Sequence, residues 1–226
     1  MKTLKGKQLT AYIDHTILKV DTRKTDIRQL CDEAEANKFY AVCVPPYFVH
    51  SASIMLKDCD VKVATVIGFP FGYSSTPSKA AEIHKAIDDG ADELDVVINI
   101  SAVKSKDWNY VENDIKTVAL ATQMKGKIIK VILETGLLNK KEIKIICEIC
   151  AKAGVNYVKT STGFHGEGAK LKDIEYLRAN LPNVIKIKAS GGIRSAKKAI
   201  KMIKAGATRL GTSASIKIIK GIEKMS

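Results

Sequence analysis

The sequence lacks the segments that mark membrane-spanning, secreted and nucleotide-binding proteins. No apolar run among the 226 residues approaches the roughly 20 residues of a membrane-spanning helix. The first ten residues carry three lysines and no following apolar stretch, so we expect no secretory signal, a cytoplasmic location and no membrane partner. Neither a G-x-G-x-x-G turn nor a P-loop is present, which argues against the common nucleotide-binding folds.

Cysteines and histidines are few, and their spacing indicates neither disulfides nor a metal site. The five cysteines are an odd number and are scattered, so we expect reduced thiols. Cys147 and Cys150 form a C-x-x-C pair, but they share one helical stripe with Ile143 and Ile146. We interpret the pair as buried packing. The four histidines show no ligand spacing, so no metal site is predicted.

Aromatic residues make up only 6% of the chain, and its positive charge is not organised for nucleic acid. The net charge of +13 comes mostly from dispersed lysines, without aromatic interleaving or an arginine cluster. We interpret it as a lysine-rich surface that also attracts a phosphorylated substrate, and we expect no nucleic-acid partner. A binding module without enzymatic activity is the alternative, and it predicts salt-sensitive binding to DNA or RNA.

The chain does contain a regular alternation of strand and helix patterns. Eight short apolar, β-branched segments are predicted as strands, at residues 12–18, 39–44, 62–67, 93–98, 128–133, 155–159, 184–189 and 208–211. Helical periodicity lies between them, for example at Trp108, Val111, Ile115 and Val118. This order predicts an α/β protein with a single (β/α)8 TIM barrel as one catalytic domain over residues 1–226. An open doubly wound sheet is the alternative.

Local signals agree with these boundaries. Thr76 followed by Pro77 predicts a helix cap and a first helical residue. Asn139 with Glu142 predicts a capping box. Three glycine-containing segments, at residues 90–92, 154–156 and 206–208, are each predicted to end a helix and lead into a strand.

Several predicted strands carry charged residues on one face, although a buried parallel strand should be almost entirely apolar. Asp95, Lys130, Lys159 and Lys188 each lie on the face opposite to the apolar residues of their strand. Edge strands would explain the alternation trivially, but a closed barrel has no edges. In a barrel these side chains point inward, where an unpaired charge is costly and is usually retained for function.

Lys159 and Lys188 also lie near the carboxyl ends of their strands, where barrel enzymes form their active sites. A lysine amine attacks a carbonyl only when it is unprotonated, although its reference pKa is about 10.4. Burial and a second ammonium group both disfavour the charged form. We therefore predict that Lys188 keeps Lys159 neutral, while Asp95 keeps the cluster near electrical balance.

Four motifs occur in order through the chain: YIDHTIL at residues 12–18, GADELDVVIN at 90–99, VKTSTGF at 158–164 and IKASGGIR at 187–194. Together they resemble the deoxyribose-phosphate aldolase family over nearly the whole chain. The resemblance implies a lyase that cleaves 2-deoxy-D-ribose 5-phosphate reversibly to acetaldehyde and D-glyceraldehyde 3-phosphate. It further implies a class I aldolase without metal or organic cofactor, and a homodimer or higher homo-oligomer.

The resemblance also assigns roles to individual residues. Lys159 matches the Schiff base lysine, Lys188 the neighbour that tunes it, and Asp95 the carboxylate of the proton relay. Barrels often bind phosphate with the loops after strands seven and eight and a helix N-terminus. The residues expected at the substrate or its phosphate are Gly163, Gly191, Gly192, Gly211, Ser213, Asp14, Thr16 and Cys43.

The chain departs from the family pattern in two places. Phe164 stands where some members carry a lysine, so we expect phosphate binding to depend less on charge. The last residues, 223–226, lack the terminal tyrosine of longer members, so we assume no proton transfer by a tail. A second enzyme hypothesis is an isomerase or synthase of the same fold that uses Asp95 and Glu134 as acid and base.

Overall fold

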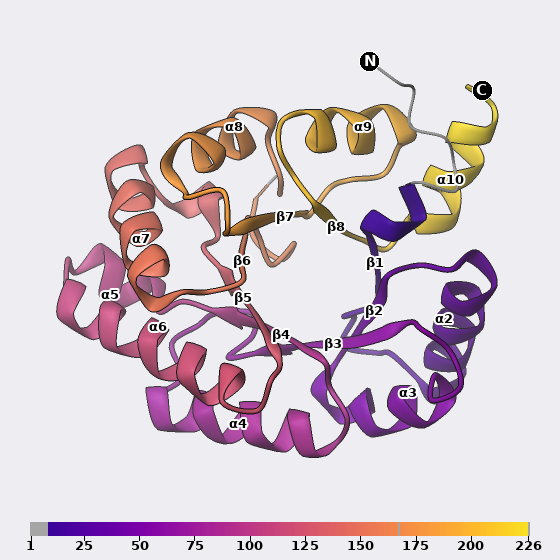
Figure 1. Cartoon of the computed structure of the whole chain (residues 1–226), viewed down its shortest axis with the longest axis horizontal. Coiled ribbons are helices and arrows are strands. Elements are labelled where there is room, and N and C mark those ends of the chain that lie inside the picture. Colours follow the sequence, from indigo (N-terminus) through magenta and orange to yellow (C-terminus); the bar gives the residue numbers. More distant parts are fainter. Residues whose placement is uncertain (1–8, 167, 226) are drawn as a thin grey trace.

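Eight parallel strands close into a barrel in chain order, and the last strand pairs with the first (Figure 1). The computed structural model describes residues 9–166 and 168–225. The strands are β1 (Ile13–Thr16), β2 (Ala41–Val44), β3 (Lys62–Ile67), β4 (Glu93–Val97), β5 (Ile128–Ile132), β6 (Tyr157–Lys159), β7 (Lys186–Ser190) and β8 (Arg209–Thr212). The predicted (β/α)8 barrel is confirmed, and the open sheet is excluded. The closed ring of strands leaves no edge strand to explain the charged faces.

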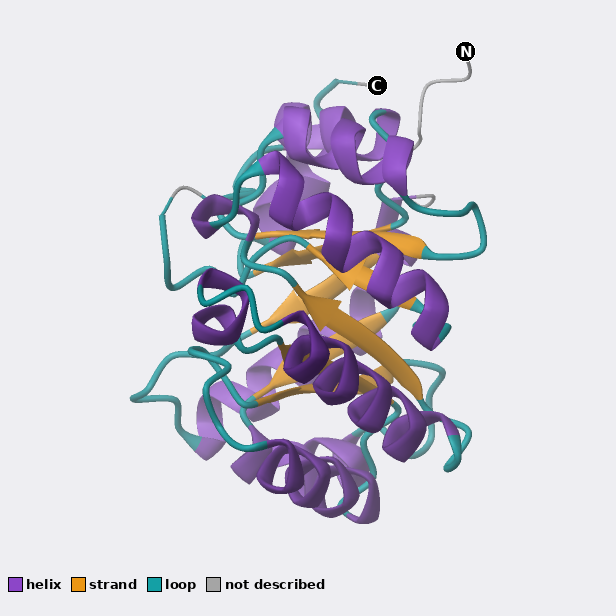
Figure 2. Ribbon diagram, turned by 90° about the vertical axis from the view of Figure 1, so that its left-hand side faces the viewer, coloured by secondary structure: helices purple, strands orange, loops and turns teal. Residues whose placement is uncertain are grey.

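Helices surround the barrel and cover the outer face of its strands (Figures 1 and 2). They are α2 (Lys24–Asn37), α3 (Val49–Met55), α4 (Thr76–Asp88), α5 (Ile100–Lys104), α6 (Trp108–Gln123), α7 (Lys140–Ala153), α8 (Leu171–Asn180), α9 (Ala196–Lys204) and α10 (Ser215–Glu223), with short 3-10 turns η1 (Thr10–Tyr12), η2 (Pro46–Phe48) and η3 (Thr135–Leu137). In the described part of the chain, none of the helices combines the length and apolarity needed to cross a bilayer.

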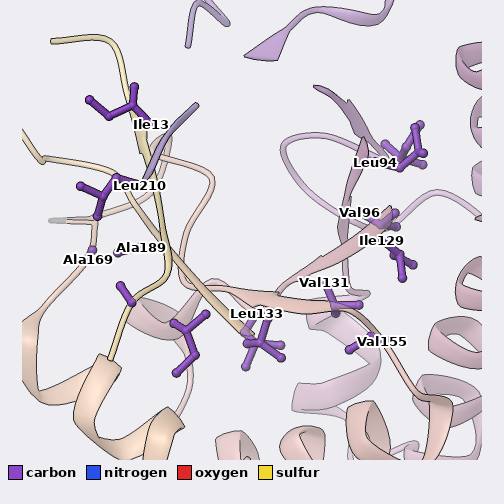
Figure 3. Close-up of a cluster of buried hydrophobic side chains, with 14 of the residues drawn as sticks. Ile13, Leu94, Val96, Ile129, Val131, Leu133, Val155, Ala169, Ala189 and Leu210 are labelled. Atoms are coloured by element: carbon purple, nitrogen blue, oxygen red, sulfur yellow. The ribbon is translucent and has the colours of Figure 1, made fainter. Parts of the chain in front are cut away.

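The main hydrophobic core lies between the strands and the helices. Leu94, Val96, Ile129 and Val131 belong to it, and they extend from β4 and β5 toward the surrounding helices (Figure 3). Because side chains alternate along a strand, the residues between them face the barrel interior. Most of the apolar surface is therefore used outside the barrel, and the interior holds the charged residues together with a smaller apolar cluster. Cys147 and Cys150 are buried free thiols of α7, as predicted.

The predicted helix boundaries are mostly confirmed. Asn139 and Glu142 form the expected capping box at the start of α7. Gly90, Gly154 and Gly206 all have positive φ angles just after a helix ends. These residues therefore end α4, α7 and α9 where the sequence indicated.

The predicted cap of α4 is wrong by one residue. The helix is capped by Ser75, whose hydroxyl oxygen accepts a hydrogen bond from the Ser78 N–H group, and Thr76 is already helical. The Thr76 hydroxyl instead donates to Asp114 of α6, with an oxygen–oxygen distance of 2.8 Å. The Thr76 side chain, which the local sequence would assign to capping, is thus used in a tertiary hydrogen bond instead.

Asp114 also forms a buried ion pair that joins α4 to α6. Lys79 Nζ lies 2.7 Å from Asp114 Oδ2, and the two side chains are 0% and 2% exposed. Removing one partner of such a pair leaves an uncompensated buried charge, which typically costs about 3–5 kcal/mol.

We therefore expect Lys79→Met to lower the free energy of unfolding by about 3–5 kcal/mol, measured by urea denaturation. Lys85→Met is the matched control, because Lys85 pairs with Asp89 on the surface of the same helix. Exposed pairs contribute about 1 kcal/mol or less. Equal losses in the two variants would contradict the structural role of the buried pair.

Candidate active site

Charged side chains from five strands meet inside the barrel and form a closed ring of alternating sign. We call this set the charge ring; in order, its members are Asp95, Lys130, Glu93, Arg209, Asp14 and Lys188. Lys130 Nζ lies 2.6 Å from Asp95 Oδ1 and 2.8 Å from Glu93 Oε2. Arg209 Nη1 lies 3.0 Å from the same Glu93 oxygen. These contacts form one half of the ring.

Asp14 and Lys188 complete the ring on its other side. Arg209 Nη1 lies 2.8 Å from Asp14 Oδ1, and Lys188 Nζ contacts Asp14 Oδ2. Lys188 Nζ also lies 2.8 Å from Asp95 Oδ2, which closes the ring. Every member is at most 2% exposed. Three acidic and three basic groups therefore balance one another without help from solvent.

Attraction within the charge ring outweighs the effect of burial on ionisation. Burial alone would raise the pKa of Asp95, but the ammonium groups of Lys130 and Lys159 hold it well below its usual range. Burial would likewise raise the pKa of Asp14, but Lys188 lowers it to about 2. Burial opposes the charge of Lys188, yet Asp14 and Asp95 raise its pKa above the usual value. Lys188 is therefore a cation in this site.

Lys159 is attached to the charge ring and reaches the cavity at the carboxyl ends of the strands. It is the last residue of β6, and its Nζ donates to Asp95 Oδ2 at 2.8 Å, the same oxygen that Lys188 binds. The cavity has a volume of about 720 Å³ and is lined by Lys159 but not by Asp95 or Lys188. Because the ring is already balanced, a protonated Lys159 adds one net positive charge to a buried cluster.

The predicted inward direction of Asp95, Lys130, Lys159 and Lys188 is confirmed by these contacts. Gly211 of β8 leaves the space that Lys188 occupies. A Cβ atom at Gly211 would lie 3.0 Å from Lys188 Cε, so a larger residue would press against the Lys188 side chain. Gly211, which was predicted to bind phosphate, thus lies against a member of the charge ring.

One side of the cavity is lined by unpaired backbone N–H groups. Gly163, Gly191, Gly192 and Ser213 line the cavity, and their N–H groups donate to no other residue in the ranges 9–166 and 168–225. Arg194 lines the cavity beside them. Several convergent N–H groups and a guanidinium form a suitable cradle for an oxyanion.

Tight packing between two loops builds this cradle. Gly191 adopts a φ of +86° after β7, and Gly168, after β6, packs directly against it. A Cβ atom at Gly168 would lie 2.4 Å from the Gly191 carbonyl oxygen. The Ala169 N–H group donates to the carbonyls of Ser190 and Gly191, both at 3.0 Å. The loops after β6 and β7 are therefore held together at the cavity wall.

Of the other residues singled out from the sequence, some line the cavity and others are buried inside the barrel. Thr16 lines the cavity, and its hydroxyl donates to the Asp14 carbonyl at 2.8 Å. The Asp14 side chain lies in the charge ring and outside the cavity lining. Cys43 is buried in a small apolar cluster with Ala64 and Val66, and burial raises the pKa of its thiol. Phe164 lines the cavity and makes an edge contact with Phe69, with ring centroids 5.2 Å apart.

Sequence reasoning missed Arg209, which links Asp14 to Glu93. A signal was present, because Arg209 is a charged residue in an apolar strand and shares its face with Gly211. Arg194 was part of a recognised motif but was not assigned to the site. In the described part of the chain, His, Cys, Asp and Glu side chains form no cluster of three or more that suits a metal ion.

The fold and the site together define a barrel enzyme with a lysine amine and an oxyanion cradle in one cavity at the carboxyl ends of its strands. A family model described as DeoC/LacD family aldolase matches residues 9–220. The chain therefore belongs to the DeoC/LacD aldolase family, and it is an enzyme of the lyase class.

Individual relatives cover nearly the whole chain. It is 47% identical to the deoxyribose-phosphate aldolase of Aciduliprofundum boonei, over 96% of this chain and 98% of that protein. It is 49% identical to deoxyribose-phosphate aldolase 1 of Bacillus licheniformis, over 96% of both chains. The solved tetrameric structure of deoxyribose phosphate aldolase from Aeropyrum pernix superposes with a TM-score of 0.92, at 30% identity, over 98% of this chain and 94% of that chain.

The charge ring predicts a loss of stability in acid. The pKa of Asp14 is lowered to about 2 in the folded protein, against about 3.9 for an unperturbed aspartate. A lowered pKa stabilises the fold at pH values above the unfolded-state pKa, and this contribution is lost as the pH falls toward the folded-state pKa. We expect the free energy of unfolding, measured in urea, to fall between about pH 4 and pH 2. Asp14→Asn should be less stable at neutral pH and should lose less in acid, whereas parallel pH curves would contradict this.

Proposed function

We propose that this chain is a deoxyribose-phosphate aldolase that cleaves 2-deoxy-D-ribose 5-phosphate reversibly to acetaldehyde and D-glyceraldehyde 3-phosphate through a Schiff base on Lys159. The observation that carries the proposal is the position of Lys159. Its amine lies in the cavity wall, 2.8 Å from Asp95 Oδ2. The same cavity is lined by Gly163, Gly191 and Gly192, whose N–H groups have no partner among the described residues. A single cavity thus contains an amine that can attack a carbonyl carbon and N–H groups that can bind the phosphate of the same small molecule.

The charge ring gives a physical reason for a neutral, nucleophilic Lys159. Lys188 is a cation and shares the Asp95 oxygen with Lys159, while Asp14 and Asp95 already have basic partners. A proton on Lys159 therefore introduces a charge that the buried cluster does not balance, and burial disfavours such a charge. A neutral amine still donates one hydrogen bond to Asp95, so the observed contact is retained.

Cleavage begins when the Lys159 amine attacks C1 of the open-chain sugar and the resulting carbinolamine loses water to form a protonated imine. The imine draws electrons from the bond between C2 and C3. When the C3 hydroxyl loses its proton, that bond breaks, glyceraldehyde 3-phosphate leaves and an enamine remains on Lys159. Protonation at C2 and hydrolysis then release acetaldehyde and restore the amine.

Lys188 is the proposed proton-handling group, and Asp95 is the carboxylate that holds it beside Lys159. Lys188 gives a proton, through water, to the hydroxyl that leaves the carbinolamine, takes the C3 hydroxyl proton, and returns it to C2 of the enamine. Hydrolysis of the imine restores the charged Lys188. Because the pKa of Asp95 is held well below its usual range, Asp95 stays ionised and orients the two amines throughout.

We further propose that the phosphate binds to the N–H groups of Gly163, Gly191, Gly192 and Ser213, with Arg194 supplying positive charge. Residues 1–226 then form one catalytic domain that needs no metal or organic cofactor, since the imine itself is the electron sink. A homodimer or higher homo-oligomer is proposed because the Aeropyrum pernix relative is tetrameric. The cytoplasmic location stays a prediction from the sequence.

Trapping with borohydride tests the Schiff base. Incubation with 2-deoxyribose 5-phosphate and borohydride should reduce the imine and leave a stable adduct on Lys159, identified by peptide mass spectrometry. Lys159→Arg should give no adduct and no cleavage. An active wild-type enzyme without an adduct would favour the isomerase or synthase hypothesis in which Asp95 and Glu134 act as acid and base.

Replacing Lys188 tests its effect on Lys159. Lys188→Leu leaves Asp14 and Asp95 short of one cation, so Lys159 becomes the group that balances the charge and is more often protonated. We expect kcat/KM at neutral pH to fall at least about tenfold, equivalent to about 1.4 kcal/mol, and the acid limb of the pH–rate profile to move to higher pH. Lys188→Arg keeps the charge and should leave that limb in place. An unchanged profile in Lys188→Leu contradicts the tuning role.

A further inference from the structure

A second buried carboxylate, Glu134, lies outside the charge ring and contacts the loop that follows β6. It comes two residues after β5 ends, and it is 1% exposed. The adjacent backbone is paired with the strand that carries the catalytic lysine, because the Leu133 N–H group donates to the Lys159 carbonyl at 3.0 Å and the Thr135 N–H group donates to the Thr160 carbonyl at 2.9 Å. Glu134 is therefore at the carboxyl end of the barrel, beside the proposed site.

The Glu134 carboxylate tethers the loop through Thr162. Its Oε2 atom accepts a hydrogen bond from the Thr162 N–H group at 3.1 Å and another from the Thr162 hydroxyl. The same hydroxyl oxygen accepts from the Phe164 N–H group at 3.1 Å. Gly163, whose N–H group has no partner among the described residues, lies between these two anchored residues. The carboxylate thus determines how the turn at residues 162–164 presents Gly163 to the cavity.

Two unfavourable features of Glu134 persist in the fold. Its φ of 56° and ψ of 60° are left-handed, a conformation that glycine or asparagine adopts more readily than glutamate. Its Oε1 atom is buried and has no hydrogen-bond partner among the described residues, which is costly for a carboxylate oxygen. Backbone strain and unpaired polar atoms of this kind are concentrated at functional sites.

We propose that Glu134 is a positioning residue for the phosphate end of the substrate, acting through Thr162 to direct the Gly163 N–H group at the phosphate. An ionised acceptor suits this task because charge-assisted hydrogen bonds are shorter and stronger than neutral ones. The inference rests on the proposed function, since it assigns the Gly163 side of the cavity to the phosphate. It predicts that Glu134 affects phosphorylated and unphosphorylated substrates differently.

Steady-state cleavage of 2-deoxyribose 5-phosphate and of 2-deoxyribose by Glu134→Gln tests this prediction. The glutamine retains one acceptor but not the charge, so the turn at 162–164 is held less firmly. For the phosphorylated sugar, KM should rise about tenfold, equivalent to about 1.4 kcal/mol, while kcat stays within about twofold. For 2-deoxyribose, kcat/KM should stay within about twofold of the wild-type value. Equal losses on both sugars, or no loss on either, would overturn the proposal.

Three further variants separate positioning from a general effect on folding. Thr162→Ser keeps the hydroxyl and should behave as wild type, whereas Thr162→Val removes it and should reproduce the KM increase. Asp173→Asn is the matched carboxylate-to-amide control, because Asp173 Oδ2 accepts from the Thr135 hydroxyl at 3.0 Å and has no link to Gly163. It should leave the KM for 2-deoxyribose 5-phosphate within about twofold. A rise equal to that of Glu134→Gln would show that any loosening of this face has the same effect.

Calorimetric titration with inorganic phosphate keeps this test independent of catalysis. Wild-type protein and Asp173→Asn should bind phosphate equally, and Glu134→Gln should bind it about tenfold more weakly. If the wild-type protein binds phosphate but cleaves neither sugar, the proposed function fails while the positioning role is still decided by the titration. If Glu134→Gln binds phosphate as tightly as wild type, the positioning role fails whatever the catalytic result.

Discussion

The active site depends on the balance of charges inside a closed barrel. The strands direct most of their apolar residues outward to the helices, and the interior holds, beside a small apolar cluster of Cys43, Ala64 and Val66, charged groups that are buried from solvent. Such groups are tolerated only when each charge has a partner. Six of them meet this condition by forming the charge ring. Lys159 is the additional amine, bound to Asp95 and lining the cavity. Its proposed reactivity follows because the ring is already balanced without a charge on Lys159.

Much of this arrangement was predictable from the sequence. Side chains alternate along a strand with a period of two, so a charge among apolar neighbours identifies the inward face without knowledge of any partner. This reasoning placed Asp95, Lys130, Lys159 and Lys188 inside the barrel. The glycines that end helices were also predictable, because the need for a left-handed residue after a helix depends only on the local sequence. Strand order and closure followed from the number of repeated units.

The partners of each charge were not predictable, because they depend on the register between distant strands. The contact of Asp14 with Arg209 requires β1 to pair with β8, which lie at opposite ends of the chain. Thr76 was assigned to a cap because its bond to Asp114 of α6 has no local signal. The left-handed backbone conformation of Glu134 could not be predicted either, because the surrounding sequence gives no signal for it. Tertiary contacts decide all three cases.

We propose that the charge ring leaves Lys159 unprotonated while Lys188 is a cation. Neutron crystallography of the unliganded enzyme at neutral pD tests this most directly, because deuterium atoms on each Nζ are then visible. We expect two deuterons on Lys159 Nζ and three on Lys188 Nζ, with both amines directed at Asp95 Oδ2. Three deuterons on Lys159, or two on Lys188, would contradict it.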